Sequence, residues 1–206
     1  DYSRLKTRAP IDLRVNTKKS NLQKASRALA ADGIETDPVD VAKTALRVRG
    51  ETRKIPQTAS YKNGAIELQD AGSQALIEAL NIPDGTRVLD YCAGGGGKTL
   101  AMGARGGRGV QFSAYDLDQD RLKALRERAQ RADVFVKLLK RDPVKDGEEF
   151  DLVVLDVPCS GSGAWRRSPD AKWKLDENRL AALVNTQAEI ISNCCKLISE
   201  SGVLAY

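Results

Sequence analysis

Residues 87–99 read RVLDYCAGGGGKT, an apolar run that passes directly into four consecutive glycines. The pattern predicts a strand over Arg87–Tyr91, a loop over Cys92–Gly97 and a helix over Lys98–Ala104. Four glycines remove every Cβ from the loop, so a ligand can approach its backbone closely. The stretch therefore predicts a strand, a ligand-binding loop and a helix at the start of an α/β domain.

Alternating strands and helices continue from this loop to the end of the chain. Further strands are predicted at Val110–Tyr115, Val134–Leu138 and Phe150–Asp156, the last apolar enough to be buried on both faces. Helices are predicted at Gln119–Ala132 and from a cap at Asp176 to Ser199, with Gly202 ending the second before a strand from Val203. Such alternation is typical of a Rossmann-like, doubly wound parallel sheet with helices on both faces.

The first 68 residues have a mixed pattern. Short strands are predicted at Leu13–Val15, Ala45–Arg49 and Ala65–Leu68, with a helix opened by Ser20 or Asn21 and closed by Gly33. We therefore divide the chain into a small α+β lobe, residues 1–68, and a Rossmann-like domain, residues 69–206. The first helix of that domain is capped by Asp70 and is expected to place Leu76, Ile77 and Leu80 on one face.

Basic residues are concentrated near the start of the chain. Residues 1–64 contain 14 Lys and Arg against 7 Asp and Glu, a net charge of +7, whereas residues 65–206 contain 19 against 21, a net of −2. A basic lobe beside a near-neutral one suits a polyanion held by one part and chemistry done in the other, although a solvated basic surface gives the same count. No apolar run approaches 18 residues, which excludes a membrane span.

Missing residue types exclude several kinds of site. The chain has no histidine, which excludes Ser-His-Asp triads and histidine metal ligands. Its four cysteines, Cys92, Cys159, Cys194 and Cys195, include no CxxC pair, so zinc ribbons are excluded and no metal is expected. Reduced thiols in a cytoplasm fit this count better than a disulfide framework. Cys194 and Cys195 are expected to lie in the core.

The glycine loop fits two classes of ligand. CAGGGGKT matches the phosphate-binding pattern GxxxxGK[ST] except that Cys92 replaces the first glycine, so a nucleotide hydrolase is a serious alternative. Asp116, however, ends the second strand, where a carboxylate can accept hydrogen bonds from both ribose hydroxyls. Asp142 follows the third strand, where it can accept from an adenine amino group, and Lys98 can neutralise a carboxylate. An adenosine held by ribose and base, without a phosphate clamp, favours S-adenosylmethionine as the cofactor.

The run Asp156-Val157-Pro158-Cys159-Ser160 brings a carboxylate and a thiol to the same cleft. Amino-group methyltransferases carry an aromatic residue where Cys159 stands, so a thiol favours methylation at carbon. Cytosine C5 is a weak nucleophile, and adding a thiolate to C6 makes it reactive toward a methyl sulfonium. Asp156 can support the pyrimidine at N3 during that step. The competing interpretation is that Cys159 is a buried small apolar side chain.

With these motifs the sequence resembles the Sun (Fmu) family of RNA cytosine-C5 methyltransferases. The resemblance rests on LRVN (13–16), QDAGSQ (69–74), VLDYCAGGGGKT (88–99) and DVPCSGSGAWRRSPDAKW (156–173). It implies a small α+β RNA-recognition lobe in front of a Rossmann-like catalytic domain, with ribosomal RNA as the expected substrate. By motif it implies cofactor contacts at Cys92, Ala93, Gly94, Gly95, Gly96, Gly97, Lys98, Asp116, Arg121, Asp142 and Asp156.

Two departures from that family bear on catalysis. The family's attacking thiol lies in a Thr-Cys-Ser motif on the next strand and its Pro-Cys cysteine helps release the product, whereas in DNA cytosine methyltransferases the Pro-Cys cysteine attacks. The resemblance thus assigns Cys159 to release. This chain has no initial Met and ends at Tyr206, where Thr-Cys-Ser would follow, so we expect a piece of a longer protein that lacks its nucleophile. Gly95 stands where the family usually has proline, and the N-terminal helical domain of many bacterial members is not in this sequence.

Residues 165–173 are basic with interleaved aromatics. Arg166, Arg167 and Lys172 are predicted RNA contacts, and a tryptophan can stack on an extruded base, although Trp173 is expected to pack against the sheet edge. The expected function is methyl transfer from S-adenosylmethionine to cytosine C5 in RNA, by a cytoplasmic monomer without a metal. The alternatives are a P-loop-like nucleotide hydrolase and a cofactor- and RNA-binding fragment without catalysis.

Overall fold

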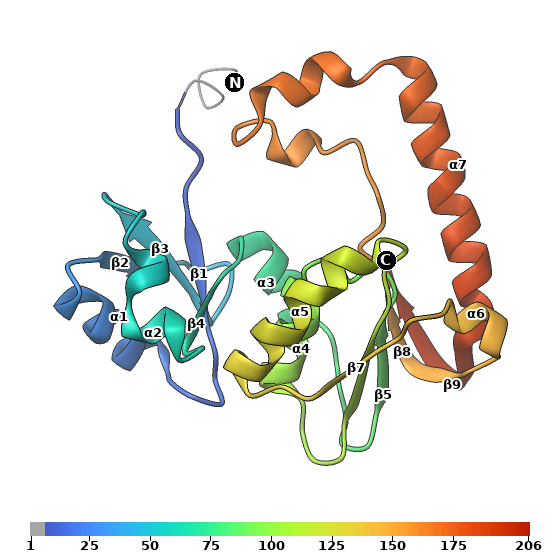
Figure 1. Ribbon diagram of the computed structural model, residues 1–206, viewed down its shortest axis with the longest axis horizontal. Helices are drawn as coiled ribbons and strands as arrows, with labels where there is room; N and C mark the ends of the chain where they lie inside the picture. Colours follow the sequence, from blue (N-terminus) through green and yellow to red (C-terminus); the bar gives the residue numbers. More distant parts are fainter. Residues whose placement is uncertain (1–6) are drawn as a thin grey trace.

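A computed structural model describes residues 7–206, which form two lobes (Figure 1). The small lobe contains β1 (Asp12–Val15), α1 (Leu22–Ala31), β2 (Glu35–Pro38), β3 (Ala45–Arg49), the 3₁₀ helix η2 (Ile55–Gln57), α2 (Ala59–Lys62) and β4 (Ile66–Leu68). Its four strands form an antiparallel sheet in the order β2-β3-β1-β4. Helix α1 is capped by Asn21, one of the two predicted caps, whose side chain accepts a hydrogen bond from the backbone N–H of Lys24; the helix buries Leu29 against Leu13 and Leu46 of the sheet.

The large lobe is a five-stranded parallel sheet in the order β7-β6-β5-β8-β9. Its elements are α3 (Ala71–Glu78), β5 (Arg87–Asp90), α4 (Gly97–Arg105), β6 (Gln111–Ala114), α5 (Gln119–Ala132), β7 (Val136–Leu138), α6 (Pro143–Asp146), β8 (Phe150–Val154), the 3₁₀ helices η3 (Ser162–Ala164) and η4 (Pro169–Lys174), α7 (Glu177–Cys194), the 3₁₀ helix η5 (Cys195–Leu197) and β9 (Ile198–Ala205). The predicted α/β class, a parallel sheet preceded by a small α+β lobe, is confirmed. The division after Leu68 stays a prediction.

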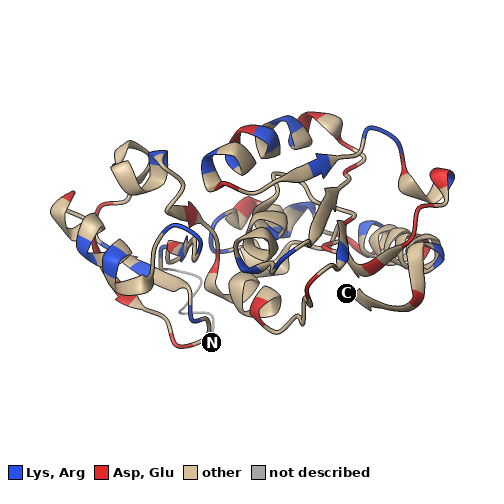
Figure 2. Ribbon diagram, turned by 90° about the horizontal axis from the view of Figure 1, so that it is seen from below, with Lys and Arg blue, Asp and Glu red and all other residues tan. Residues whose placement is uncertain are grey.

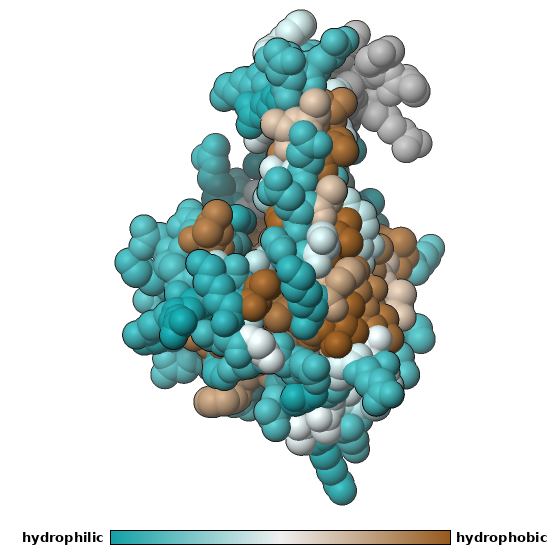
Figure 3. Space-filling view, turned by 90° about the vertical axis from the view of Figure 1, so that its right-hand side faces the viewer, coloured by the Kyte–Doolittle hydropathy of each residue, from teal (hydrophilic) through white to brown (hydrophobic). Residues whose placement is uncertain are grey.

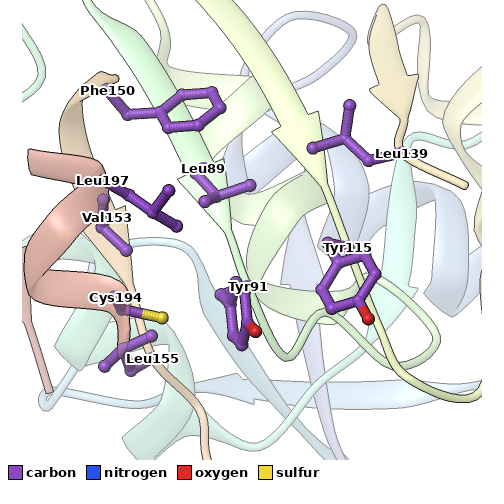
Figure 4. Packing of buried hydrophobic residues seen from close by; sticks show 9 residues of the cluster. All are labelled: Leu89, Tyr91, Tyr115, Leu139, Phe150, Val153, Leu155, Cys194 and Leu197. Atoms are coloured by element: carbon purple, nitrogen blue, oxygen red, sulfur yellow. The ribbon is translucent and has the colours of Figure 1, made fainter. Parts of the chain in front are cut away.

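Both faces of the parallel sheet are covered. Side chains of successive strand residues point to opposite faces, so Leu89 packs toward Leu197 of η5 while Val88 packs toward Met102 of α4. Figure 4 shows the first of these two clusters, in which Cys194 at the end of α7 also takes part. The expectation that strand β8 is buried on both faces is confirmed, because Leu152, Val153 and Val154 are all buried.

The end of helix α7 differs from the prediction. The helix ends at Cys194 rather than Ser199, and η5 leads into β9 at Ile198, which pairs with Phe150 of β8. Gly202 lies inside β9 and does not end the helix; a Cβ there would come within 2.9 Å of the Phe150 carbonyl oxygen. Pairing with the sheet thus takes precedence over helix propensity. Cys194 is buried as expected, whereas Cys195 is exposed.

Helix α3 presents a narrower apolar face than expected. Ile77 is buried, but the side chain of Leu76 is 65% exposed. Consecutive helical residues differ by about 100° in direction, so Leu76 points well away from the buried direction of Ile77. The buried positions are spaced by three residues instead, at Ala71, Gln74 and Ile77.

The surface carries mixed charge, and an apolar region lies on the side of helix α7. Lys and Arg are interspersed with Asp and Glu over both lobes (Figure 2). Apolar side chains gather on the side of the molecule where α7 lies (Figure 3), and Val184 of α7 and Val203 of β9 are both more than half exposed. Among residues 7–206 no helix is long and apolar enough to cross a membrane.

Candidate active site

The glycine loop lies between β5 and α4, at the carboxyl edge of the parallel sheet. Gly94 and Gly96 have φ values of 54° and 79°, which favour glycine. A Cβ at Gly96 would lie 2.1 Å from a side-chain carbon of Leu125, and one at Gly94 would lie 2.5 Å from Arg121 Nη2. Glycine is therefore required at these two positions by backbone conformation and by the side chains of α5. Gly95 has no positive φ, so its place in the loop needs no glycine.

Asp116 follows β6 and is held against the glycine loop. Its Oδ2 accepts a hydrogen bond from the backbone N–H of Gly94 at 2.7 Å, and its Oδ1 accepts one from the N–H of Asp118 at 2.9 Å. Arg121 Nη1 lies 3.6 Å from Oδ2. The loop and the end of the second strand thus meet through a carboxylate that is nearly buried.

One open pocket of about 1190 Å³, solvent at its mouth included, brings together predicted residues from four segments. We call it the main pocket; it is lined by Cys92, Ala93, Asp116, Arg121, Asp142, Asp156 and Cys159. A second pocket lies beside it between the loop and the small lobe and is lined in part by Gly95, Gly97 and Lys98. Gly94 and Gly96 line neither pocket; they shape the loop.

Tyrosine side chains form the floor of the main pocket. The rings of Tyr91 and Tyr115 lie 5.0 Å apart between centroids (Figure 4), and the Tyr91 hydroxyl donates to Asp142 Oδ1 at 3.1 Å. The same carboxylate caps helix α6 by accepting from the N–H of Val144. Burial, followed by the charge of Asp142, raises the pKa of Tyr91, so its hydroxyl keeps its proton. Asp142 is thus oriented by two donors at the pocket wall.

Lys98 and Asp156 form an ion pair across the second pocket. Lys98 Nζ lies 2.5 Å from Asp156 Oδ2, and the lysine is the more buried partner. Lys98, which was predicted from the sequence to neutralise a cofactor carboxylate, pairs with the carboxylate of Asp156 in this structure. The predicted pyrimidine-supporting acid therefore has a cation beside it.

The four thiols have different surroundings. Burial raises the pKa of Cys92 to about 12, with the charges of Asp116 and Asp90 acting in the same direction. Burial likewise raises the pKa of Cys194 to about 12. Cys159 is exposed at the pocket, in a loop whose Pro158 carbonyl accepts from Gln187 Nε2 at 2.8 Å. The competing interpretation of Cys159 as a buried apolar side chain is therefore wrong.

Asp90 was not among the predicted site residues. It ends β5 and is buried; its Oδ2 accepts from Thr99 Oγ1 at 2.6 Å, whereas its Oδ1 has no hydrogen-bond partner. Burial raises the pKa of this carboxyl to about 6. The side chain lines the second pocket. Asp116 was predicted because it is an aspartate at the carboxyl end of a strand. The same criterion, applied to strand β5, would also have identified Asp90.

The segment from η3 to η4 reaches back to the start of the small lobe (Figure 1) and to the cap of helix α3. Arg166 Nη2 donates to Thr7 Oγ1 at 2.8 Å and to the Arg8 carbonyl, and Arg167 Nη2 lies 2.5 Å from Asp70 Oδ2. Trp173 is 80% exposed, with Lys172 Nζ 4.6 Å from its ring centroid, so the expectation that it packs against the sheet edge is wrong. Two of the predicted RNA contacts are thus occupied by partners within the chain.

Comparison with known proteins decides the family. The family model "16S rRNA methyltransferase RsmB/F" matches residues 77–206, and a "Methyltr_RsmF/B-like, ferredoxin-like domain" matches residues 3–53. The chain belongs to the RsmB/F family. The resemblance to Sun-type RNA methyltransferases, stated from the motifs, is thereby confirmed.

One relative and two solved structures illustrate the similarity. The ribosomal RNA small subunit methyltransferase B of Vibrio cholerae is 34% identical over 205 residues, which are 97% of this chain and 47% of the relative. The crystal structure of a methyltransferase homolog protein from Pyrococcus horikoshii has a TM-score of 0.81 at 26% identity, over 98% of this chain and 65% of that one. NSun6 from the same organism has a TM-score of 0.79 at 17% identity, over 98% and 76%, and shares the fold. The chain spans about half the length of the curated relatives it matches.

Proposed function

We propose that this chain carries the cofactor and target site of an enzyme that transfers a methyl group from S-adenosylmethionine to C5 of a cytosine in ribosomal RNA. The observation that carries the proposal is the main pocket, in which the glycine loop, Asp116 and Asp142 meet the Asp156–Cys159 segment. Membership of a 16S rRNA methyltransferase family supports the reaction class. When bound, the cofactor supplies the methyl group on a sulfonium sulfur.

The adenosine half of the cofactor fits the main pocket. Asp116 keeps lone pairs for the two ribose hydroxyls, because a carboxylate accepts about four hydrogen bonds and two are made here. Asp142 can accept from the adenine amino group beside Tyr91. Leu117 is 89% exposed at the pocket and offers an apolar side chain to the base.

The methionine half fits the second pocket. The unpartnered Oδ1 of Asp90 is an acceptor for a cationic amino group, and an ammonium there would lower its pKa from about 6. Gly95 and Gly97 have no Cβ, so the methionine part of the cofactor can approach the loop backbone closely.

The rival proposal of a P-loop-like hydrolase has less support. A phosphate-binding loop needs its backbone N–H groups free for anions. Here the Gly94 N–H donates to Asp116, whose carboxylate would repel a phosphate at the loop. The P-loop lysine position, Lys98, is likewise engaged by Asp156.

For the target base we propose roles for Asp156 and Cys159. Asp156 supports cytosine N3, and Lys98 holds that carboxylate in place. Cys159 is proposed to act in product release, following the resemblance to the Sun family, in which the Pro-Cys cysteine has that role. The small lobe, residues 1–68, together with Arg166, Arg167 and Lys172, is proposed to bind the RNA. The expected monomeric state and cytoplasmic location stay predictions.

Calorimetry tests the cofactor class. The chain should bind S-adenosylmethionine or its demethylated product at roughly micromolar Kd, about 8 kcal/mol of binding free energy. MgATP should bind more weakly, since Asp116 repels its phosphates. Tighter binding of MgATP than of S-adenosylmethionine would reverse the assignment in favour of a nucleotide hydrolase.

A further inference from the structure

Helix α5 connects the small lobe to the glycine loop through Arg128. The Nη2 and Nε atoms of Arg128 donate to Oε2 of Glu67 on strand β4, at 2.9 and 3.3 Å. Its Nη1 donates to the backbone carbonyl of Gly95. One guanidinium therefore bridges a carboxylate of the small lobe and the loop that borders both pockets.

Glu67 is a firm anchor for this bridge. Its side chain is 2% exposed, and its Oε1 accepts a further hydrogen bond from Arg131. The guanidinium of Arg14 lies near the same carboxylate; burial lowers the pKa of Arg14 to about 10, and the charge of Glu67 opposes that shift. One buried carboxylate thus faces three guanidinium groups, and charge-assisted hydrogen bonds of this kind are the strong ones.

The bond to Gly95 restrains a loop position that lies between the two left-handed glycines. Gly94 and Gly96 hold left-handed conformations against Arg121 and Leu125 of helix α5. Gly95 has neither a Cβ nor a ring to limit its φ, so the direction of its carbonyl depends on an external partner. Arg128 is one helical turn beyond Leu125 and supplies that partner.

The contacts around the bridge keep the lobes in register. Asn16 Nδ2 donates to the carbonyls of Gly64 and Ala132, and Lys19 Nζ donates to those of Asn63 and Arg131. The guanidinium of Arg131 stacks over Tyr61 at 4.3 Å. The C-terminal end of α5 is therefore bound to the small lobe on several sides, so the position of Glu67 fixes that of Arg128.

We propose that Arg128 is a positioning residue for the cofactor loop, and that the small lobe sets the conformation of this loop through Glu67. The inference rests on the proposed function for its consequence, which is that cofactor affinity depends on a carboxylate of the proposed RNA-binding lobe. Contact with RNA at the small lobe would then reach the cofactor loop through Glu67 and Arg128.

The test compares four glutamine variants of the full 206-residue chain. Arg128→Gln and Glu67→Gln break the bridge; Arg131→Gln removes the other partner of Glu67 without touching the loop. Arg126→Gln, on the exposed side of the same helix, is the matched control. Hydrogen exchange of residues 92–98 without cofactor should be faster in the first two variants and unchanged in the last two.

Calorimetry with the demethylated cofactor gives the second readout. Affinity should fall about tenfold in Arg128→Gln, as for loss of one charge-assisted bond, and stay within about twofold in Arg131→Gln and Arg126→Gln. In the Arg128→Gln background, Glu67→Gln should cause no further loss. Arg128→Lys should be more thermally stable than Arg128→Gln, but its loop should exchange hydrogen as fast. A single ammonium cannot reach both Glu67 and the Gly95 carbonyl as the two arms of a guanidinium do.

The outcomes separate this inference from the proposed function. If the unaltered chain binds no cofactor, the proposed function fails, while the exchange experiment still tests loop positioning. If Arg128→Gln leaves loop exchange and affinity unchanged, the positioning role is wrong. Equal losses of affinity in Arg131→Gln and Arg128→Gln would also overturn it, since they would reflect general loosening of the interface.

Discussion

The carboxylate of Asp116 accepts a hydrogen bond from the backbone N–H of Gly94, so the end of strand β6 is bound to the glycine loop that follows strand β5. Parallel strands bring their carboxyl ends to one edge of a sheet, and this bond is the direct contact between two motifs 22 residues apart. Asp116 therefore holds the loop and, in the function we propose, also meets the ribose.

Replacing Asp116 should remove most cofactor binding. Asp116→Ala loses the acceptors for the ribose hydroxyls and releases the Gly94 N–H, which together should weaken binding of the demethylated cofactor about a hundredfold, or about 3 kcal/mol. Calorimetry measures the change. Asp120→Ala is the control, because Asp120 is exposed and pairs with Lys123 on the same helix. Unchanged affinity in Asp116→Ala would show that the ribose lies elsewhere.

The buried carboxyl of Asp90 should make stability depend on pH. Its pKa is about 6 in the folded chain against 3.8 for an ordinary aspartate, so the folded state binds the proton more tightly. The favourable contribution is complete below pH 3.8 and is lost as the pH rises through 6, about 3 kcal/mol in all.

Asp90→Asn tests this dependence. Asparagine keeps an acceptor for Thr99 but carries no charge, so the variant should unfold at a higher temperature than the original chain at pH 7.5, with the gap closing toward pH 5. Cofactor affinity should fall in Asp90→Asn, because the side chain proposed to accept from the cofactor's amino group no longer carries a negative charge. Thermal unfolding at the two pH values and calorimetry measure these effects. A variant less stable at pH 7.5, with the original pH profile, would contradict the prediction.

The exposed thiol of Cys159 should not attack cytosine. Incubated with RNA that contains 5-fluorocytidine and with S-adenosylmethionine, the 206-residue chain should bind cofactor yet form no covalent adduct on a denaturing gel. Cys159→Ala should behave alike. An adduct that forms with the original chain and vanishes in Cys159→Ala would make Cys159 the nucleophile.

RNA binding should be electrostatic and should involve the segment between η3 and η4. Affinity should fall steadily with the logarithm of salt concentration, and changing Arg166 and Arg167 to Glu should weaken it. Both arginines also have partners within the chain, Arg166 in the small lobe and Arg167 at Asp70. The control is therefore Asp70→Asn, which frees Arg167 while keeping the cap of helix α3. Asp70→Asn should bind RNA at least as tightly as the original chain. If Asp70→Asn and the arginine-to-glutamate variant weaken RNA binding equally, the arginines serve contacts within the chain rather than RNA.

The two lobes should unfold together. Asn16→Ala leaves the buried carbonyls of Gly64 and Ala132 without their donor, which should cost about 3 kcal/mol of unfolding free energy. The helix-cap variant Asn21→Ala, on the same lobe, should cost about 1 kcal/mol. Denaturant unfolding followed by two spectroscopic probes measures both. Separate transitions for the lobes in the original chain would show that the interface is weaker than its contacts indicate.

The local sequence determined the α/β class, the loop and the carboxylates at the strand ends. Helix α5 runs from Gln119 to Ala132 as predicted, because its cap and its spacing of leucines act within a few turns. Asp116, Asp142 and Asp156 could be grouped in advance, since parallel strands deliver the residues that follow them to a common edge.

Tertiary structure alone decided which polar side chains meet across the lobes. Arg128 and Glu67 are 61 residues apart, and Arg166 and Thr7 are 159 apart, distances over which no periodicity reports a contact. The end of α7 was likewise set by pairing of Ile198 with β8, a non-local interaction that prevails over helix propensity. The raised pKa of Asp90 has the same origin: burial depends on the whole fold, whereas the sequence shows only an aspartate at the end of a strand.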